Sequence, residues 1–212
     1  MSLNDIAIVG AGGLGKEISV LIHQINQANL TWNVVGFYDD GKKPGTAVAG
    51  HRVLGTITEL NAVTYPLHVI LGLGDPQTKQ QVLRQLTNPH LQFPVLVHPT
   101  ATVGSQITVG VGTVVSAGCR LTIDITVGNH VLLNLNTTIG HDVSIGDFTS
   151  IMPGVHVSGA VKIEPAVLVG SGATLLQSIT IGQSARIGAG AVVTQSVDSG
   201  KTVIGIPAKP KS

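Results

Sequence analysis

The spacing of hydrophobic residues changes once along the chain, near Pro94, and the change separates two regions. Before it, short apolar runs with alternating or β-branched residues take turns with segments of helical spacing. After it, an aliphatic residue recurs at every sixth position. Because side-chain period follows backbone geometry, the two regions are predicted to fold differently.

The first region alternates between strand and helix patterns. Strands are predicted at 5–10 (DIAIVG), 33–40 (NVVGFYDD) and 68–74 (HVILGLG). Helical spacing begins at Lys16 and continues through Ile18, Leu21, Ile22 and Ile25, and a second helix is predicted from Pro76 to Leu86. The alternation predicts a small, mostly parallel α/β sheet of about three strands.

A glycine-rich segment, GAGGLG, joins the first predicted strand to the first helix. Backbone N–H groups at a helix N-terminus attract anions, and glycine lets a ligand approach closely. Asp39 and Asp40 follow about 24 residues after Gly15, as an acidic residue does in dinucleotide fingerprints. With only about three strands, a half-site for one nucleotide diphosphate is favoured over NAD. A tight turn without a ligand is the alternative.

The second region repeats without a break. Its sixth positions are all Val, Ile or Leu: Val97, Val103, Val109, Val115, Leu121, Val127, Leu133, Ile139, Ile145, Ile151, Val157, Ile163, Val169, Leu175, Ile181, Ile187 and Val193. About a third would be aliphatic by chance. The residue two before each is often small or β-branched, and Cys119 takes one such place, which predicts a packing role. A hexapeptide repeat of this length predicts a parallel β-helix whose aliphatic column points inward.

Composition excludes several classes of function. The net charge is +1 with 11% charged residues, so neither nucleic acid nor a membrane surface is favoured as a partner. A single cysteine suits a reducing compartment, no apolar run is long enough to span a bilayer, and the first residues lack the basic start of a secretory signal. We therefore expect a cytoplasmic protein.

One polar pair interrupts the repeat. His141 and Asp142 follow Ile139 at a predicted corner, where their side chains project from the coil instead of entering it. An imidazole in such a place is either a solvated turn residue or a general base.

Together the two regions resemble the hexapeptide-repeat sugar acyltransferases of the sialic-acid O-acetyltransferase (NeuD) family, which includes acetyltransferases of nucleotide-linked 4-amino sugars. The resemblance lies in GAGGLGK, FYDD, GLGD at 72–75, NLNTTIGHD and the ending GIPAK at 205–209. It implies a Rossmann-like nucleotide-sugar-binding domain at 1–93, a left-handed β-helix at 94–212, and a homotrimer that binds acetyl-CoA between subunits without a metal.

The resemblance also implies residue roles. His141 matches the general base and Asp142 the carboxylate that orients it. Positions that match substrate contacts are Gly12, Gly13, Leu14, Asp39, Asp40, Gly74 and Asn134. Positions that match coenzyme contacts are Ser150, Gly159, Ala189 and Lys209, and the amide of Gly159 is our candidate oxyanion donor. Relatives often have histidine at the positions of Leu14 and Ser150.

Four functions remain open at this point. The leading one is acetyl-CoA-dependent N-acetylation of a UDP- or GDP-linked 4-amino-deoxy sugar, and the nearest alternative is O-acetylation of a sugar hydroxyl such as that of sialic acid. A metal-dependent hydratase shares the β-helix, but no H-x4-H spacing is present. A nucleotide-sensing module would be supported only by the glycine loop and Asp39.

Overall fold

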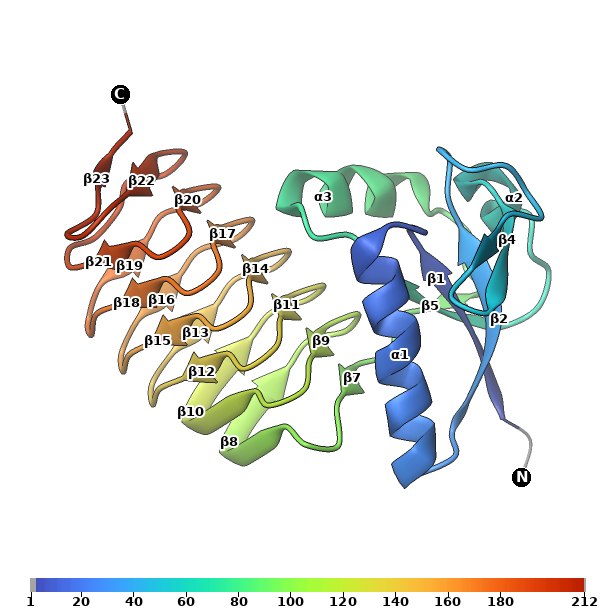
Figure 1. Cartoon of the computed structure of the whole chain (residues 1–212), viewed down its shortest axis with the longest axis horizontal. Helices are drawn as coiled ribbons and strands as arrows, with labels where there is room; N and C mark the ends of the chain where they lie inside the picture. The colour runs from blue at the N-terminus through green and yellow to red at the C-terminus, as the bar shows by residue number, and fades with distance from the viewer. Residues whose placement is uncertain (1–2, 212) are drawn as a thin grey trace.

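The computed structural model describes residues 3–211, which form a sheet domain packed beside a column of coils (Figure 1). The sheet has the strand order β3-β4-β2-β1-β5-β6. Its strands are β1 (Asn4–Val9), β2 (Trp32–Tyr38), β3 (Ala47–Val48), β4 (His51–Gly55), β5 (Leu67–Leu71) and β6 (Leu91–Gln92). The helices are α1 (Gly13–Ala28), α2 (Ile57–Asn61) and α3 (Pro76–Gln85).

The prediction of a mostly parallel sheet is confirmed, but the expected number of about three strands is wrong. All pairs are parallel except β3 with β4. The sequence pattern missed β3 and β6 because each has two residues, too few to show a period, and β4 ends in glycine. The argument against a larger nucleotide fold, which rested on the strand count, therefore falls. We divide the chain at residues 93 and 94, between β6 and β7.

Helix α1 belongs to both parts of the molecule. Its apolar face buries Ile18, Leu21 and Ile22 in one cluster with Ile8 and Phe37 of the sheet. The same cluster includes the outward-facing side chains of the first three coil rungs: Leu96, Val114 and Leu132. Burying an aliphatic side chain of this size stabilises a fold by about 1.5–3 kcal/mol, so this shared layer holds the sheet domain against the coil.

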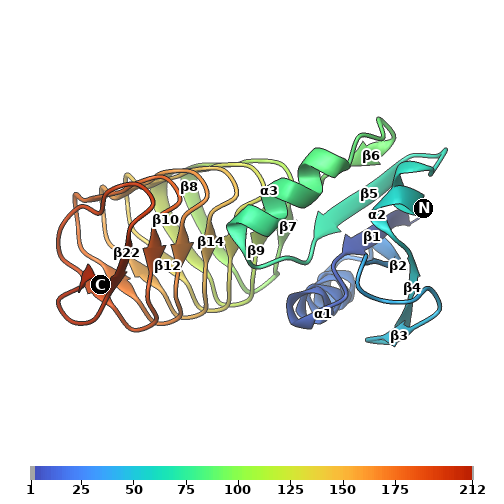
Figure 2. The same cartoon turned by 90° about the horizontal axis from the view of Figure 1, so that it is seen from above.

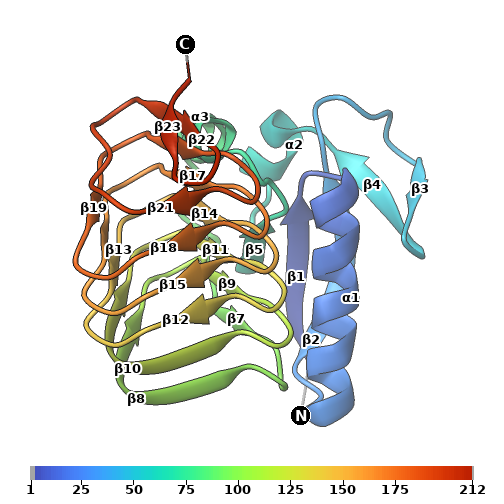
Figure 3. The same ribbon diagram turned by 60° about the vertical axis from the view of Figure 1, so that its left-hand side comes forward.

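The predicted β-helix is confirmed as a column of parallel strands, except that its last two strands pair antiparallel. Leu121 pairs with Ile139, and Ile139 pairs with Val157, so each rung follows the last after one turn of the coil. Figure 3 shows one such ladder, β12, β15, β18 and β21. The strands are β7 (Leu96–Val97), β8 (Thr102–Val109), β9 (Val114–Val115), β10 (Arg120–Val127), β11 (Leu132–Leu133), β12 (Thr138–Ile139), β13 (Ser144–Ile145), β14 (Ser150–Ile151), β15 (His156–Val157), β16 (Lys162–Ile163), β17 (Leu168–Val169), β18 (Thr174–Leu175), β19 (Thr180–Ile181), β20 (Arg186–Ile187), β21 (Val192–Val193), β22 (Thr202–Ile204) and β23 (Lys209–Pro210).

The inward column is buried from Val115 onward, each member being at most 3% exposed, and Cys119 is buried as predicted. The first three positions depart from the prediction. Val97 is 39% and Val103 is 43% exposed, and Val109 is only half-buried. These residues belong to the first turn of the coil, which has a neighbouring turn on one side only. An inward side chain there is covered from one direction.

The corners of the coil repeat as regularly as its strands. The third residue after each inward aliphatic has a left-handed backbone, with φ between +53° and +72° from Gln106 through Gly190. Asp142, with φ of +58°, is one of these corner residues. Aspartate tolerates this conformation better than most side chains do, so the corner itself explains an acidic residue beside His141.

Helix α3 begins beside the coil and runs back to β6 of the sheet domain, as the view from above shows (Figure 2). Its N-terminus is capped by Asp75, whose side chain accepts a hydrogen bond from Thr78 N at 3.0 Å. The predicted helix from Pro76 to Leu86 is therefore confirmed to within one residue.

Candidate active site

The glycines of the first loop divide into two kinds. A side chain at Gly15 would collide with the carbonyl oxygen of Gly10, and one at Gly72 would press on the Cα of Gly15. These glycines let strand, helix and loop pack at close range. Gly12 and Gly13, in contrast, face open space and have no left-handed backbone. Packing does not require glycine there, so a tight turn alone does not explain them.

Asp39 and Asp40 lie directly after β2, at the edge of the sheet where the glycine loop begins. Asp39 Oδ2 accepts a hydrogen bond from the amide of Ala11 at 2.6 Å, and its Oδ1 accepts from Gly41 N at 2.8 Å. Asp40 Oδ1 accepts from Ile57 N at 2.9 Å, at the start of α2. Both carboxylates therefore hold the loops around them in place. Their remaining lone pairs can accept hydrogen bonds from a ligand.

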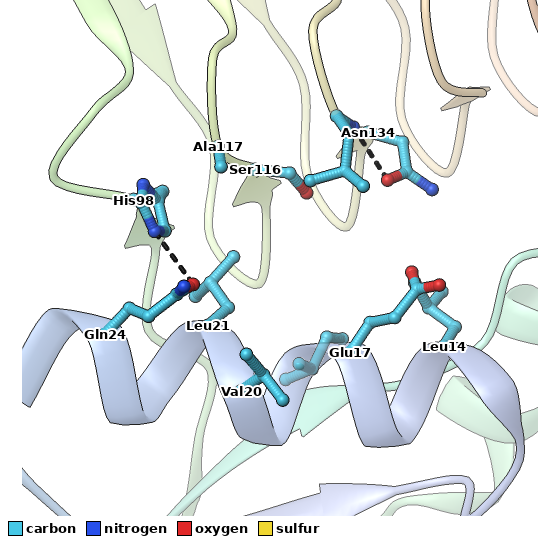
Figure 4. Close-up of a pocket in the computed structure, with 11 residues that line it drawn as sticks. Leu14, Glu17, Val20, Leu21, Gln24, His98, Ser116, Ala117 and Asn134 are labelled. Carbon is cyan, nitrogen blue, oxygen red and sulfur yellow. Dashed lines mark hydrogen bonds between the residues drawn. The ribbon is translucent and has the colours of Figure 1, made fainter.

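A cleft of about 280 Å³ separates α1 from one corner of the coil (Figure 4). Leu14 and Glu17 line it from the helix, and Asn134 lines it from the coil. His98 closes one end, with its Nε2 2.9 Å from Gln24 Oε1. Asn134 is 6% exposed, and its Oδ1 accepts from Leu135 N at 2.7 Å, so the amide group is held in place beside the cleft.

Gly74 belongs to the same region. A side chain there would lie 3.5 Å from Met152 Cε and 3.9 Å from Leu14 Cδ2. Four of the residues that match substrate contacts thus gather where the glycine loop meets the coil: Gly13, Leu14, Gly74 and Asn134. Sequence reasoning missed Glu17 and Met152, which carry no motif of their own.

His141 and Asp142 lie on a different corner. The Nδ1 atom of His141 is 2.7 Å from Asp142 Oδ2, and both side chains are more than 60% exposed. If the carboxylate accepts from Nδ1–H, Nε2 carries the free lone pair, and it lies beside Gly159. The prediction that this ring projects from the coil is confirmed. Within one protomer, however, the histidine does not line the cleft that contains Asn134.

Gly159 sits one turn of the coil beyond His141 and is directly beneath its ring. A side chain at 159 would overlap the Nε2 and Cε1 atoms of the imidazole. The absence of a side chain therefore leaves room for the ring to lie along the corner while Asp142 holds its other nitrogen.

The remaining positions that match coenzyme contacts are scattered. Ala189 and Lys209 are exposed near the C-terminal end of the coil. Ser150 is fully buried, and its hydroxyl has no hydrogen-bond partner within residues 3–211. The predicted coenzyme contact at Ser150 stays a prediction.

The described part of the chain shows neither a metal-binding cluster nor a membrane-spanning helix. Residues 3–211 contain no cluster of three His, Cys, Asp or Glu side chains that suits a metal ion. In that same part of the chain, none of the helices combines the length and the apolar character needed to cross a bilayer.

A parallel β-helix with an outward histidine–aspartate pair and a glycine-loop domain at its side is the architecture of a hexapeptide-repeat acyltransferase. Comparisons with known proteins agree. The family model described as the PglD N-terminal domain matches residues 5–86. The acetyltransferase domain of PglB from Neisseria gonorrhoeae, solved in complex with acetyl coenzyme A, is 32% identical, with a TM-score of 0.91 over 99% of this chain and 100% of that one.

Two further relatives are connected with nucleotide sugars, one through its bound ligand and one through its name. PerB from Caulobacter crescentus, solved with CoA and GDP-perosamine, is 26% identical with a TM-score of 0.86, over 100% of this chain and 99% of that one. A UDP-N-acetylbacillosamine N-acetyltransferase of Bacillus subtilis is 30% identical over 118 residues, 54% of this chain and 52% of the relative. The match thus spans about half the length of this curated relative. The chain belongs to the hexapeptide-repeat sugar acyltransferases.

Proposed function

We propose that the protein transfers the acetyl group of acetyl-CoA to the amine of a nucleotide-linked 4-amino-deoxy sugar, with His141 as general base. The observation that carries the proposal is the pair of His141 and Asp142, exposed on a corner of the coil above a glycine. The full-length similarity to the PglB and PerB acetyltransferases gives it independent support.

The geometry suits direct attack on a thioester. The neutral sugar amine attacks the thioester carbonyl and forms a C–N bond while the C–S bond breaks. His141 Nε2 accepts the proton that the amine loses, and CoA leaves as a thiolate that is then protonated. Asp142 stabilises the imidazolium through Nδ1, and the backbone N–H of Gly159 is proposed to donate a hydrogen bond to the developing oxyanion. No acyl-enzyme intermediate is needed because the thioester is already activated.

The sheet domain is proposed to hold the nucleotide sugar. Gly12 and Gly13 leave open space at the N-terminus of α1, where backbone N–H groups favour a diphosphate. Asp39 and Asp40 border this space, and Leu14, Gly74 and Asn134 continue it towards the coil. Whether the nucleotide is UDP or GDP is a question for the assay below.

The site we propose is assembled between protomers of a homotrimer. His141 and the cleft beside Asn134 lie on different corners of one coil, so a second copy is needed to bring a histidine to the cleft. Exposed apolar side chains lie near both parts of the proposed site. Ile123 lies one turn of the coil before His141, and Val20 and Leu135 line the cleft. Packing of three flat-sided coils would cover them. Ala189 and Lys209 are proposed coenzyme contacts, and a cytoplasmic location is part of the proposal.

The test is a direct acetylation assay with purified protein. UDP- and GDP-4-amino-deoxy sugars and free sialic acid are each incubated with acetyl-CoA, and CoA release and product mass are measured. We expect turnover only with a nucleotide-linked amine. Turnover with sialic acid alone would replace the proposal by the O-acetyltransferase alternative, and no turnover with any acceptor would contradict it.

A further inference from the structure

Helix α3 is fastened to the coil by two side chains one helical turn apart. The Nζ of Lys79 donates to the carbonyl oxygens of His130 at 2.8 Å and of Thr149 at 3.2 Å. The carboxylate of Asp75 pairs with Arg186 of β20, with 3.3 Å between Oδ2 and Nη1. We call these five residues the α3 clamp. They connect the first turn of the helix to three separate turns of the coil.

The lysine is an unusual anchor. Lys79 is only 2% exposed, and burial lowers the pKa of its amine to about 7, an effect that nearby Asp75 only partly offsets. Burial, together with the charge of Lys79, also lowers the pKa of the neighbouring His130 to about 4. Lysine is seldom buried without a partner, because removing its charge from water is costly. If the only requirement were to stabilise the fold, an apolar side chain at position 79 would do so without this desolvation cost.

General packing does not explain the clamp, because the sheet domain is already held elsewhere. The apolar face of α1 buries Leu96, Val114 and Leu132 of the coil. Helix α3 packs Val82 and Leu86, at its C-terminal end, on the apolar cluster of the sheet domain. Its fully buried residues, Pro76 and Lys79, lie in its first turn, where neither belongs to an apolar cluster of the coil. Without the clamp, the first turn of α3 and the loop before it would be tied to the coil only weakly.

That loop is residues 72–75, and it borders the proposed nucleotide-sugar site. Gly74 directly precedes the capping residue Asp75, and it lies against Met152 and Leu14. Asp75 both caps α3 and pairs with the coil, so a shift of the helix moves Gly74 with it. Asp75 of the clamp is thus the next residue in the chain after Gly74, which lies against Leu14 of the cleft.

We propose that Lys79 and Asp75 are positioning residues that set the wall of the nucleotide-sugar site by fixing the 72–75 loop against the coil. The inference rests on the proposed function for its substrate. It does not depend on that function for its geometry. Neither side chain is assigned contact with the reacting atoms.

The experiment compares Lys79→Met, which keeps the length of the side chain, with Asp75→Asn, which keeps a capping oxygen. Arg84→Met is the matched control, since it removes an exposed cation from the same helix. We expect the KM for the nucleotide sugar to rise about tenfold in both variants, while the KM for acetyl-CoA stays within about twofold. Amide hydrogen exchange at residues 72–75 should become faster in both variants but not in the control.

A purely structural role would give a different result, because general destabilisation affects both substrates alike. Equal changes in the two KM values, or unchanged exchange at 72–75 in folded variants, would overturn the inference. If Lys79→Met does not fold, Asp75→Asn and Arg186→Leu decide it by the same readouts. If the wild-type protein acetylates no amino sugar, the proposed function fails, and the exchange data still test whether the clamp holds the loop.

Discussion

The corners of the coil and the loops of the sheet domain both hold proposed site residues, but they hold them differently. At the coil corners, one backbone conformation recurs at every sixth residue, so the place of His141 follows from its distance to Ile139. In the sheet domain, each loop has its own shape, and the carboxylates of Asp39 and Asp40 are hydrogen-bonded to neighbouring amides. The repeat therefore presents reactive groups, whereas the sheet domain must build its site from contacts between loops.

The largest effect is expected at the coil corner. Replacing His141 by Asn removes the proton acceptor but keeps a polar side chain of similar reach. The kcat should fall by about two to four orders of magnitude, while acetyl-CoA binding changes little. Steady-state kinetics and calorimetry measure the two quantities, and near-normal turnover would contradict the base assignment.

A pair of glycine variants tests whether the glycine loop serves packing or binding at each position. Gly15→Ala places a methyl group against the carbonyl of Gly10, and we expect a loss of about 2–4 kcal/mol in the free energy of unfolding. Gly13→Ala meets nothing, so stability should hold while nucleotide-sugar affinity falls about tenfold. Urea denaturation and calorimetry distinguish the two, and equal destabilisation would show that both glycines serve packing.

The ring position of His141 can be disturbed without touching the histidine. Gly159→Ala puts a methyl group where the imidazole lies, and the exposed ring is the part that can move. We expect kcat to fall about 10- to 100-fold with little change in melting temperature. Gln177→Ala, one turn further along the corner, is the control and should remain active.

The smallest effect concerns pH and the buried lysine. The amine of Lys79 has a pKa of about 7 when folded, against 10.5 for an ordinary lysine, so between these values the unfolded chain binds a proton that the folded protein lacks. Stability therefore rises with pH in this interval. Measured against Lys79→Met, the wild-type free energy of unfolding should gain about 2 kcal/mol from pH 7.5 to 9.5.

That comparison with Lys79→Met removes contributions from other groups that titrate in the same range. The charged or titratable groups next to the lysine are Asp75 and His130, and these in turn interact with Arg186 and Asp147. They are unchanged in the variant. A flat difference across the interval would show that the lysine is not buried in solution.

How far the sequence predicts this molecule depends on the range of the interactions involved. The column from Val115 to Val193 and the outward placement of His141 follow from a local period, which a single sequence displays. The full burial of Ser150 does not follow from this period, because it depends on which residues pack over that strand. The local sequence pattern of the helix predicts an exposed side chain at Lys79. Only its hydrogen bonds to residues of the coil, 51 and 70 positions away in the sequence, reveal its role.

Helix α1 has a consequence for engineering. Its buried face completes one continuous apolar layer that starts in the sheet and ends on Leu96, Val114 and Leu132 of the coil. Swapping glycine-loop modules between relatives by cutting the polypeptide at residue 94 would therefore split that layer. A functional chimera has to carry over the outward residues of these three rungs together with the glycine-loop module.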